Sequence, residues 1–199
     1  MEQKKILLKE VVLAFPNLFA ARENMKFPGS GKTFSAQIRI YDSDPQAAAK
    51  IEAIKQAMQQ AASDKWGTQG PRVYKAAIDS KNTRMLQRND EEGFFYFNAK
   101  RREDQGGPVV VGRSREVLTS ANGPRSGDIC NVIFHIWCYD KTSRGFSAEL
   151  QGVQFVREGE VTIGGTSVAK ADDFEQLEAP ASQGAWGSAN AAEGEDIPW

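Results

Sequence analysis

The segment FFYFNAKRR, from Phe94 to Arg102, divides into two chemically different faces. Alternate side chains of a β-strand point to opposite sides, so Phe95, Phe97 and Ala99 share one face. The opposite face mixes aromatic rings, an amide and cations: Phe94, Tyr96, Asn98, Lys100 and Arg102. This alternation predicts a strand that packs one face into a core and presents aromatic and basic side chains on the other.

Two further segments show the same division. In CNVIFHIWCY the core face comprises Cys130, Val132, Phe134, Ile136 and Cys138, and the opposite face comprises Asn131, Ile133, His135, Trp137 and Tyr139. The segment KTFSAQIRIY, from Lys32 to Tyr41, is a half-buried strand that adds Arg39 and Tyr41 to its polar face. Large apolar groups clustered on an exposed face usually mark a binding surface, so these strands predict one.

The rest of the chain supplies more strands and one helix. The strand candidates are KKILLKEVVLAF (4–15), which Pro16 ends, RVYKAAI (72–78) and GFSAELQGVQFVREG (145–159). An amphipathic helix follows Asp44 and Pro45 and runs to Gly67, with apolar residues at helical spacing: Ala47, Ile51, Ile54, Met58 and Ala61. Five or six strands and one helix predict a mainly β fold, a small barrel or sandwich with the helix inserted between strands.

Charge is distributed unevenly along the 199 residues. Residues 1–157 hold 24 Lys and Arg against 17 Asp and Glu, a net charge of +7, whereas residues 158–199 hold one Lys against nine acidic residues, a net charge of −8. This asymmetry predicts a nucleic-acid partner for the basic part, although acidic tails also occur for solubility. We expect a folded domain over residues 1–162 and a disordered acidic tail over 163–199, which is too polar to form a core.

Several other classes of protein fit the sequence poorly. The stretch PGSGKTF (28–34) resembles a phosphate-binding loop, but Lys26 stands where the first glycine belongs and a strand follows instead of a helix. Cys130, His135 and Cys138 do not converge on a metal, because His135 lies on the opposite strand face. No nucleophile and base are marked out by spacing, and we expect neither a signal peptide nor a membrane-spanning segment. We expect a cytoplasmic protein that is not an enzyme and has no cofactor.

Single-stranded nucleic acid explains the aromatic and basic faces, because its bases stack on rings while its phosphates are held by Lys and Arg. The predicted binding residues are Arg39, Tyr41, Lys75, Phe94, Tyr96, Lys100, Arg101, Arg102, Trp137 and Tyr139. The insertion 101–127 adds Arg113, Arg115 and Arg125 as further candidates. In the alternative interpretation, Phe94 and Trp137 lie under the helix or a loop as a second small core.

The segments GFFYFNAKRR, SGDICNVIFHIWCYD and GFSAELQGVQFVREGE, with FPNLF and IYDSDP, resemble the single-stranded-DNA-binding proteins of tailed bacteriophages over about residues 5–162. The resemblance implies an OB-fold, a five-stranded barrel that coats single-stranded DNA during phage DNA replication, recombination or repair in the cytoplasm of the bacterial host. It places Tyr96, Lys100, Arg102, Trp137 and Tyr139 on the binding face.

The C-terminus EDIPW resembles the acidic tips of such proteins, which more commonly end in Pro-Phe. Its residues, Glu195, Asp196, Ile197, Pro198 and Trp199, are expected to bind replication or recombination proteins. The acidic tail is also expected to compete with DNA for the basic barrel. Two alternative functions remain at this point, a recombination or strand-annealing factor and an enzyme of nucleic-acid metabolism.

Overall fold

The computed structural model describes residues 4–23, 25, 28–79, 84–140, 143–160 and 163–164. Most of the predicted tail, including the tip from Glu195 to Trp199, lies outside the described residues.

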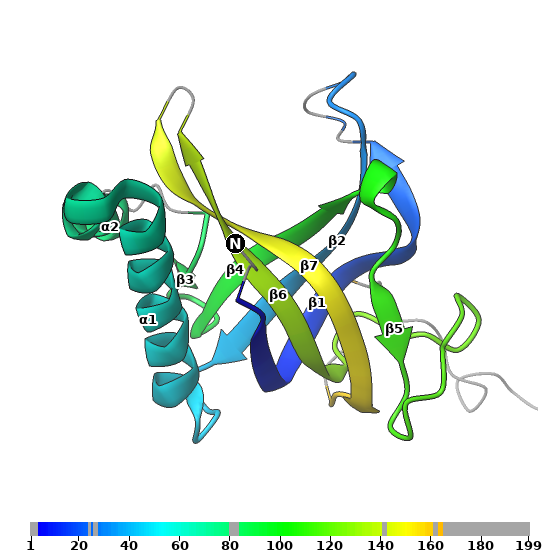
Figure 1. Cartoon of the computed structure of the whole chain (residues 1–199). Helices are drawn as coiled ribbons and strands as arrows, with labels where there is room; N and C mark the ends of the chain where they lie inside the picture. The colour runs from blue at the N-terminus through cyan, green and yellow to red at the C-terminus, as the bar shows by residue number, and fades with distance from the viewer. Residues whose placement is uncertain are drawn as a thin grey trace, which may run out of the picture. The chain divides into compact units, whose positions relative to one another are not determined.

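Five strands close into a barrel: β1 (Ile6–Glu23), β2 (Lys32–Tyr41), β4 (Phe94–Arg102), β6 (Ile129–Asp140) and β7 (Arg144–Arg157) (Figure 1). β1 pairs antiparallel with β2 and with β6, β2 pairs with β4, and β6 pairs with β7. A short parallel pairing of β4 with β7, at Ala99 with Ala148 and Lys100 with Glu149, closes the ring. The predicted mainly β, OB-fold-like barrel is therefore confirmed.

Two strands of three residues flank the barrel. β3 (Gln87–Asn89) pairs antiparallel with the first half of β4, and β5 (Val109–Val111) pairs parallel with β7. A 3-10 turn, η2 (Glu103–Gln105), follows β4 directly.

β1 is longer than the sequence predicts. It continues through Pro16 to Glu23, so the expectation that Pro16 ends this strand is wrong. The register with β2 shifts between Ala14 and Asn17, where Phe15 has a positive φ of 49°. A bulge of this kind accommodates proline, because a residue outside the regular ladder has no strand hydrogen bond to lose.

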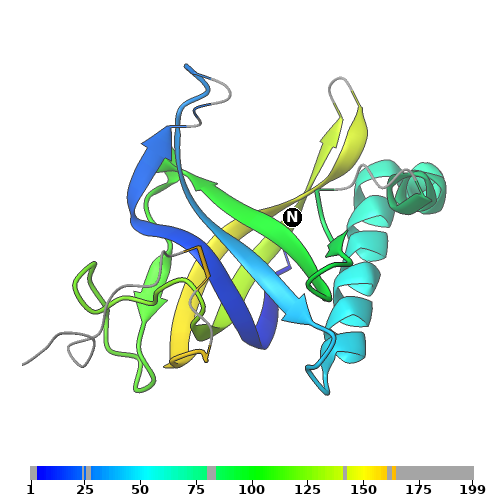
Figure 2. The ribbon, with the colours of Figure 1, turned by 180° about the vertical axis from the view of Figure 1, so that it is seen from behind.

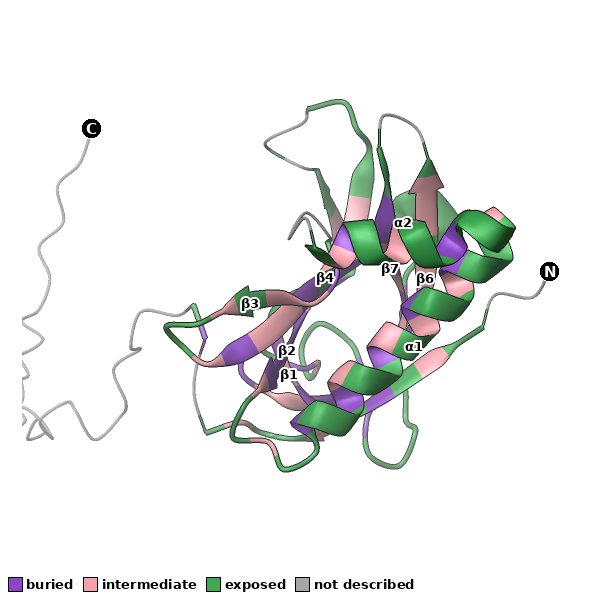
Figure 3. Ribbon diagram, turned by 90° about the vertical axis from the view of Figure 1, so that its left-hand side faces the viewer, coloured by how far each residue is buried: buried purple, intermediate pink, exposed green. Residues whose placement is uncertain are grey.

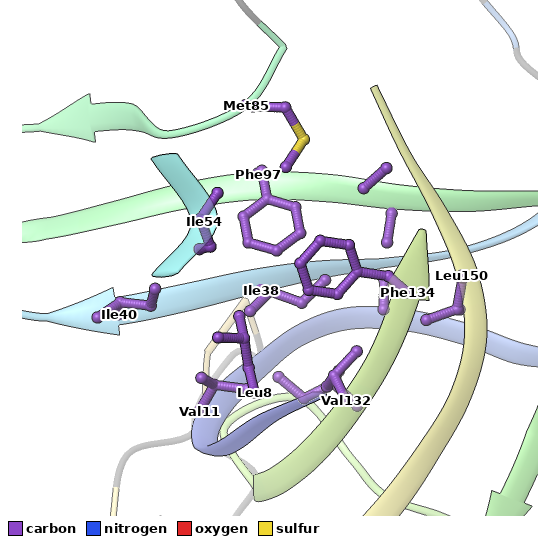
Figure 4. Packing of buried hydrophobic residues seen from close by; sticks show 14 of the residues in the cluster. Leu8, Val11, Ile38, Ile40, Ile54, Met85, Phe97, Val132, Phe134 and Leu150 are labelled. Atoms are coloured by element: carbon purple, nitrogen blue, oxygen red, sulfur yellow. The ribbon is translucent and has the colours of Figure 1, made fainter. Parts of the chain in front are cut away.

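The core fills the barrel with the residues that alternation predicts (Figure 4). The rings of Phe97 and Phe134 lie 5.0 Å apart between centroids, tilted by 53°, and Ile38 and Leu150 are buried with them. Phe95 is the exception on its face: it is half-buried and lies under the Arg88 guanidinium, 4.6 Å from the ring centroid.

The helical insertion lies between β2 and β3 and has two helices. α1 (Ala47–Trp66) confirms the predicted amphipathic helix, and Figure 3 shows buried positions recurring among exposed ones along it. Asp44 precedes α1 and accepts a hydrogen bond from the buried Lys50 ammonium. Ile54 and Met58 of α1 join the barrel core. None of the helices described is long and apolar enough to cross a membrane.

The segment RVYKAAI is helical, so its prediction as a strand is wrong. It lies in α2 (Gly70–Asp79), which follows α1 through the 3-10 turn η1 (Gly67–Gln69). Pro71 suits the first turn of a helix. Tyr74 packs edge-on against Phe146 with centroids 6.4 Å apart, and Ala77 is buried one helical turn later. The segment has seven residues, which is too short for the helical spacing of Tyr74 and Ala77 to outweigh the strand preference of Val and Tyr.

Candidate nucleic-acid interface

The outward side chains of β2 and β4 form one continuous surface, here called the β2–β4 face. The strands pair antiparallel, and outward residues lie directly opposite one another in five rows. These pairs are Tyr41 with Phe94, Arg39 with Tyr96, Gln37 with Asn98, Ser35 with Lys100, and Thr33 with Arg102. The structure thus brings Arg39, Tyr41, Tyr96, Lys100 and Arg102 together, as alternation predicts.

From Lys100 the surface continues across β7 to β6. Lys100 lies opposite Glu149, Glu149 opposite His135, and Ser147 opposite Trp137. A hollow of about 430 Å³, here called the barrel groove, lies over this part. Its lining residues are Thr33, Arg84, Lys100, Arg102, Gln105, Trp137, Ser147, Ala148 and Glu149.

The barrel groove joins residues from strands far apart in the sequence. Trp137 has 48% of its surface exposed, and Lys100 and Arg102 are exposed in the same hollow. Figures 1 and 2 show the β1–β2 and β6–β7 strand pairs extending from the same end of the barrel. The interpretation of Trp137 as part of a second small core is therefore wrong. The groove offers one aromatic ring and three cations, Arg84, Lys100 and Arg102, and these are the kinds of group that bind single-stranded nucleic acid.

Tyr139 continues the aromatic surface beyond Trp137 on the same face of β6. The two ring centroids are 5.9 Å apart, and the Arg84 guanidinium lies 5.4 Å from the Tyr139 centroid. Tyr139 pairs across the hairpin with Gly145, where a Cβ atom would lie 2.3 Å from the tyrosine Oη. The absence of a side chain at Gly145 therefore makes room for the Tyr139 ring.

Phe94 is 2% exposed, so the expectation that it offers an open ring for stacking is wrong. Its ring centroid lies 5.1 Å from that of Tyr41 and 5.8 Å from that of Tyr96, and the Arg39 guanidinium covers it at 4.4 Å. Large groups at neighbouring outward positions cover one another. Phe94 therefore supports the half-exposed rings of Tyr41 and Tyr96.

Arg39 is also more enclosed than predicted, with 8% of its surface exposed. Its Nε donates to Gln37 Oε1 at 2.7 Å, and its Nη1 lies 3.6 Å from the Glu92 carboxylate. The guanidinium also lies 5.5 Å from the ring of Phe15. These contacts give Arg39 a part in holding the face together.

The Arg101 guanidinium is committed to protein contacts. Its Nε and Nη2 donate to the carbonyl oxygens of Gly106 and Gln105, both at 2.8 Å, and its Nη1 pairs with Glu149 at 3.1 Å. Arg101 thus fixes the η2 turn against β7, and its assignment as a phosphate contact is not favoured by this geometry. By contrast, the Arg102 side chain is 69% exposed, and its one ion pair among the described residues is with Asp104, whose side chain is 65% exposed.

The remaining predicted cations lie apart from the groove. Lys75 is exposed on α2 and lines none of the hollows described for this part of the chain. Arg113, Arg115 and Arg125 are exposed in the segment that follows β5. Arg84, in contrast, lines the groove and was not predicted. It precedes β3 outside any alternating segment, so strand periodicity gave no signal for it.

Acidic side chains surround the opposite end of the β2–β4 face. An open hollow there is bordered by Gln37, Arg39, Arg88, Asn89, Asp90, Glu91, Phe94 and Tyr96. Arg88 donates to both carboxylate oxygens of Asp42 at 2.6 Å, and this contact lowers the pKa of Asp42. Because Arg88 is already paired, the favourable end for a phosphate chain is that of Lys100 and Arg102.

The structure does not assemble Cys130, His135 and Cys138 into a metal site. Cys130 lies in the core, and burial raises the pKa of its thiol to about 12, whereas His135 lies on the outward face opposite Glu149. No group of three or more His, Cys, Asp or Glu residues within the described ranges is placed to hold a metal. The segment 28–34, which resembles a phosphate-binding loop, leads into the strand β2 and not into a helix.

Known proteins are similar to this chain over most of its length. The family model of the single-stranded-DNA-binding protein of Enterobacter phage Enc34 matches residues 4–184. Protein p50 of Acyrthosiphon pisum secondary endosymbiont phage 1 is 32% identical over 182 residues, which cover 87% of this chain and 94% of p50.

Solved structures share the fold. The Enc34 single-stranded-DNA-binding protein has a TM-score of 0.55 at 16% identity, covering 86% of this chain and 90% of that one. Its complex with single-stranded DNA has a TM-score of 0.54 at 18% identity, covering 78% and 88%. The bacteriophage T7 single-stranded-DNA-binding protein gp2.5 has a TM-score of 0.51 at 18% identity, covering 91% and 100%.

Proposed function

This chain belongs to the phage Enc34 single-stranded-DNA-binding protein family, and from that premise we propose that it coats single-stranded DNA in replication, recombination or repair in the host cytoplasm. The observation that supports this most directly is the barrel groove, where the exposed Trp137 lies with Lys100 and Arg102. The Enc34 protein, a structural neighbour, has been solved with single-stranded DNA.

In the proposed mechanism, the half-exposed or exposed rings of Tyr41, Tyr96, Trp137 and Tyr139 stack on bases. Lys100, Arg102 and Arg84 neutralise phosphates along the same path. Phe94 and Arg39 position the rings from beneath. Neither kind of contact reads a base sequence, so the proposed binding is general for single strands, and the role we propose is that of a binding protein and not of an enzyme. Duplex DNA binds more weakly, because its base faces are already stacked.

A titration of intrinsic tryptophan fluorescence tests this function. Single-stranded and duplex oligonucleotides are added at low and high salt to the full chain and to a Trp137→Phe control, which identifies the signal of the groove. Preference for the single strand, with affinity that falls as salt rises, supports the proposal. Equal affinity for both forms of DNA contradicts it.

The C-terminal tip is proposed to recruit replication or recombination proteins. The residues from Glu195 to Trp199 combine two acidic groups with an apolar end, which suits a partner pocket that has a basic rim. The whole segment 158–199 carries −8 against +7 for residues 1–157, so it also competes with DNA for the barrel.

Deletion of residues 193–199 is therefore expected to strengthen single-strand binding by about threefold to tenfold at low salt, with little change at high salt because salt screens charge. Fluorescence anisotropy measures both affinities. A Trp199→Ala variant, which keeps every acidic group, is the matched control and should bind DNA as the full chain does. Unchanged affinity after the deletion would remove the competition and leave the partner role, which a pull-down with the same variants tests separately.

A further inference from the structure

A second hollow lies between α2 and the β6–β7 strand pair, outside the barrel groove. It has a volume of about 860 Å³ and is lined by Arg72, Val73 and Ala76 of α2, by Arg84, and by Tyr139 and Arg144 of the strand pair, among others. We propose that this helix hollow extends the single-strand path, so that α2 holds nucleotides beyond those in the barrel. The proposal rests on the proposed function of the barrel groove.

The charge of the helix hollow favours a polyanion. Three arginines line it, and none of its described lining residues is acidic. Arg144 is already engaged, since it pairs with Asp140 at 3.1 Å and donates to Gln69 Oε1 at 2.8 Å. Arg72 and Arg84 are exposed and form no ion pair or hydrogen bond with the described residues, so both guanidinium groups are available to phosphates.

The two hollows are continuous along one surface. Arg84 lines both of them. Trp137 lines the barrel groove and Tyr139 lines the helix hollow, and their rings are neighbours on one face of β6, 5.9 Å apart. A DNA single strand with a base stacked on Trp137 would therefore reach Tyr139 next and then the arginines of the helix hollow.

Part of the lining that α2 gives to the helix hollow is apolar. Val73 and Ala76 of α2 line it, which gives the edge of a base or a sugar a surface to pack against. An acidic peptide would also satisfy the arginines. The two aromatic rings that lead out of the barrel groove favour a nucleic acid, because its bases can stack on the rings while its phosphates contact the arginines.

The experiment compares oligonucleotides of two lengths on the full chain. Fluorescence anisotropy is measured with labelled oligo-dT of about 5 and about 16 nucleotides, lengths that bracket the site of one OB-fold. Arg72→Glu changes a residue that lines the helix hollow but not the barrel groove. Lys75→Glu makes the same charge change on an exposed residue of the same helix that lines neither hollow.

Arg72→Glu is expected to lower the affinity for the long oligonucleotide by about tenfold, because one phosphate contact is lost. The affinity for the short oligonucleotide should fall by less than about twofold. Lys75→Glu should change neither by more than about twofold. The neutral variant Arg72→Ala should lower the salt slope by about 0.7 for the long oligonucleotide. Circular dichroism should show an unchanged melting temperature for each variant.

The site would be overturned if Arg72→Glu lowered the affinity for both oligonucleotides equally, or if Lys75→Glu lowered the affinity as much as Arg72→Glu does. Either result would indicate a long-range effect of charge and not a contact. A wild-type protein that binds both oligonucleotides while Arg72→Glu leaves both unaffected would refute the helix hollow alone. If the wild type bound neither oligonucleotide, the proposed function itself would fail.

Discussion

Replacement of Tyr96 and Trp137 together by alanine is expected to weaken single-strand binding by about 100-fold, since each base stacked on an aromatic ring contributes roughly 1–3 kcal/mol. Tyr96 is half-exposed on β4 and Trp137 is 48% exposed on β6, so neither side chain belongs to the barrel core, although alanine at position 96 uncovers one side of Phe94. Anisotropy titration at moderate salt measures the loss. The salt dependence should stay the same, because no phosphate contact is removed.

Two control variants make this result specific. Tyr96→Phe keeps the ring that covers Phe94 and should retain most of the affinity. Val117→Ala removes an apolar side chain that is 77% exposed in the segment after β5, away from the groove, and should bind as the wild type does. A double alanine variant that melts like the wild type and still binds DNA tightly would rule out these two rings as the stacking surface.

Replacement of Lys100 and Arg102 together by glutamate is expected to weaken single-strand binding at low salt by about as much as the double alanine variant does. Both side chains are exposed in the barrel groove, and within the part of the chain that the structure describes Arg102 has one ion pair, with the exposed Asp104. Loss of two phosphate contacts should lower the slope of log affinity against log salt by about 1.4 for a single strand. The difference from the wild type should therefore shrink as salt rises.

The matched control reverses Arg113 and Arg115, which are exposed in the segment after β5 and lie outside the groove. It changes the net charge by the same amount. If this control lost as much affinity as the Lys100 and Arg102 variant, overall charge would account for binding and the groove would not. Titrations at three salt concentrations separate the two results.

The alternation of apolar and polar side chains along individual β-strands predicted much of the fold and part of the site. Phe97, Val132 and Phe134 lie in the core as expected, and the outward position of Trp137 follows from the same rule. This rule does not predict which residues of different β-strands become neighbours. The burial of Phe94 depends on Tyr41, which belongs to another strand and lies opposite only because of the register.

The other differences have similar causes. Arg101 is held by carbonyl groups of the η2 turn, a geometry that depends on loop conformation and has no sequence period. Arg84 enters the groove from an irregular segment before β3. Lys75 was assigned to a strand but lies on α2, where a window of seven residues concealed the helical spacing. Loop conformation, an irregular segment and a short helix decided these three positions, and strand alternation describes none of them.

The way the barrel closes also bears on how the chain acquires its structure during synthesis. β1, which comes before the other barrel strands in the chain, pairs with β6, which begins at Ile129, and the last barrel pairing joins β4 to β7 near Ala148. Contacts of such long sequence separation slow folding into the millisecond to second range typical of β-barrels. The backbone groups of β1 that pair with β6, from Ile6 to Val12, therefore stay without this partner until β6 has been translated, and β7 completes the barrel.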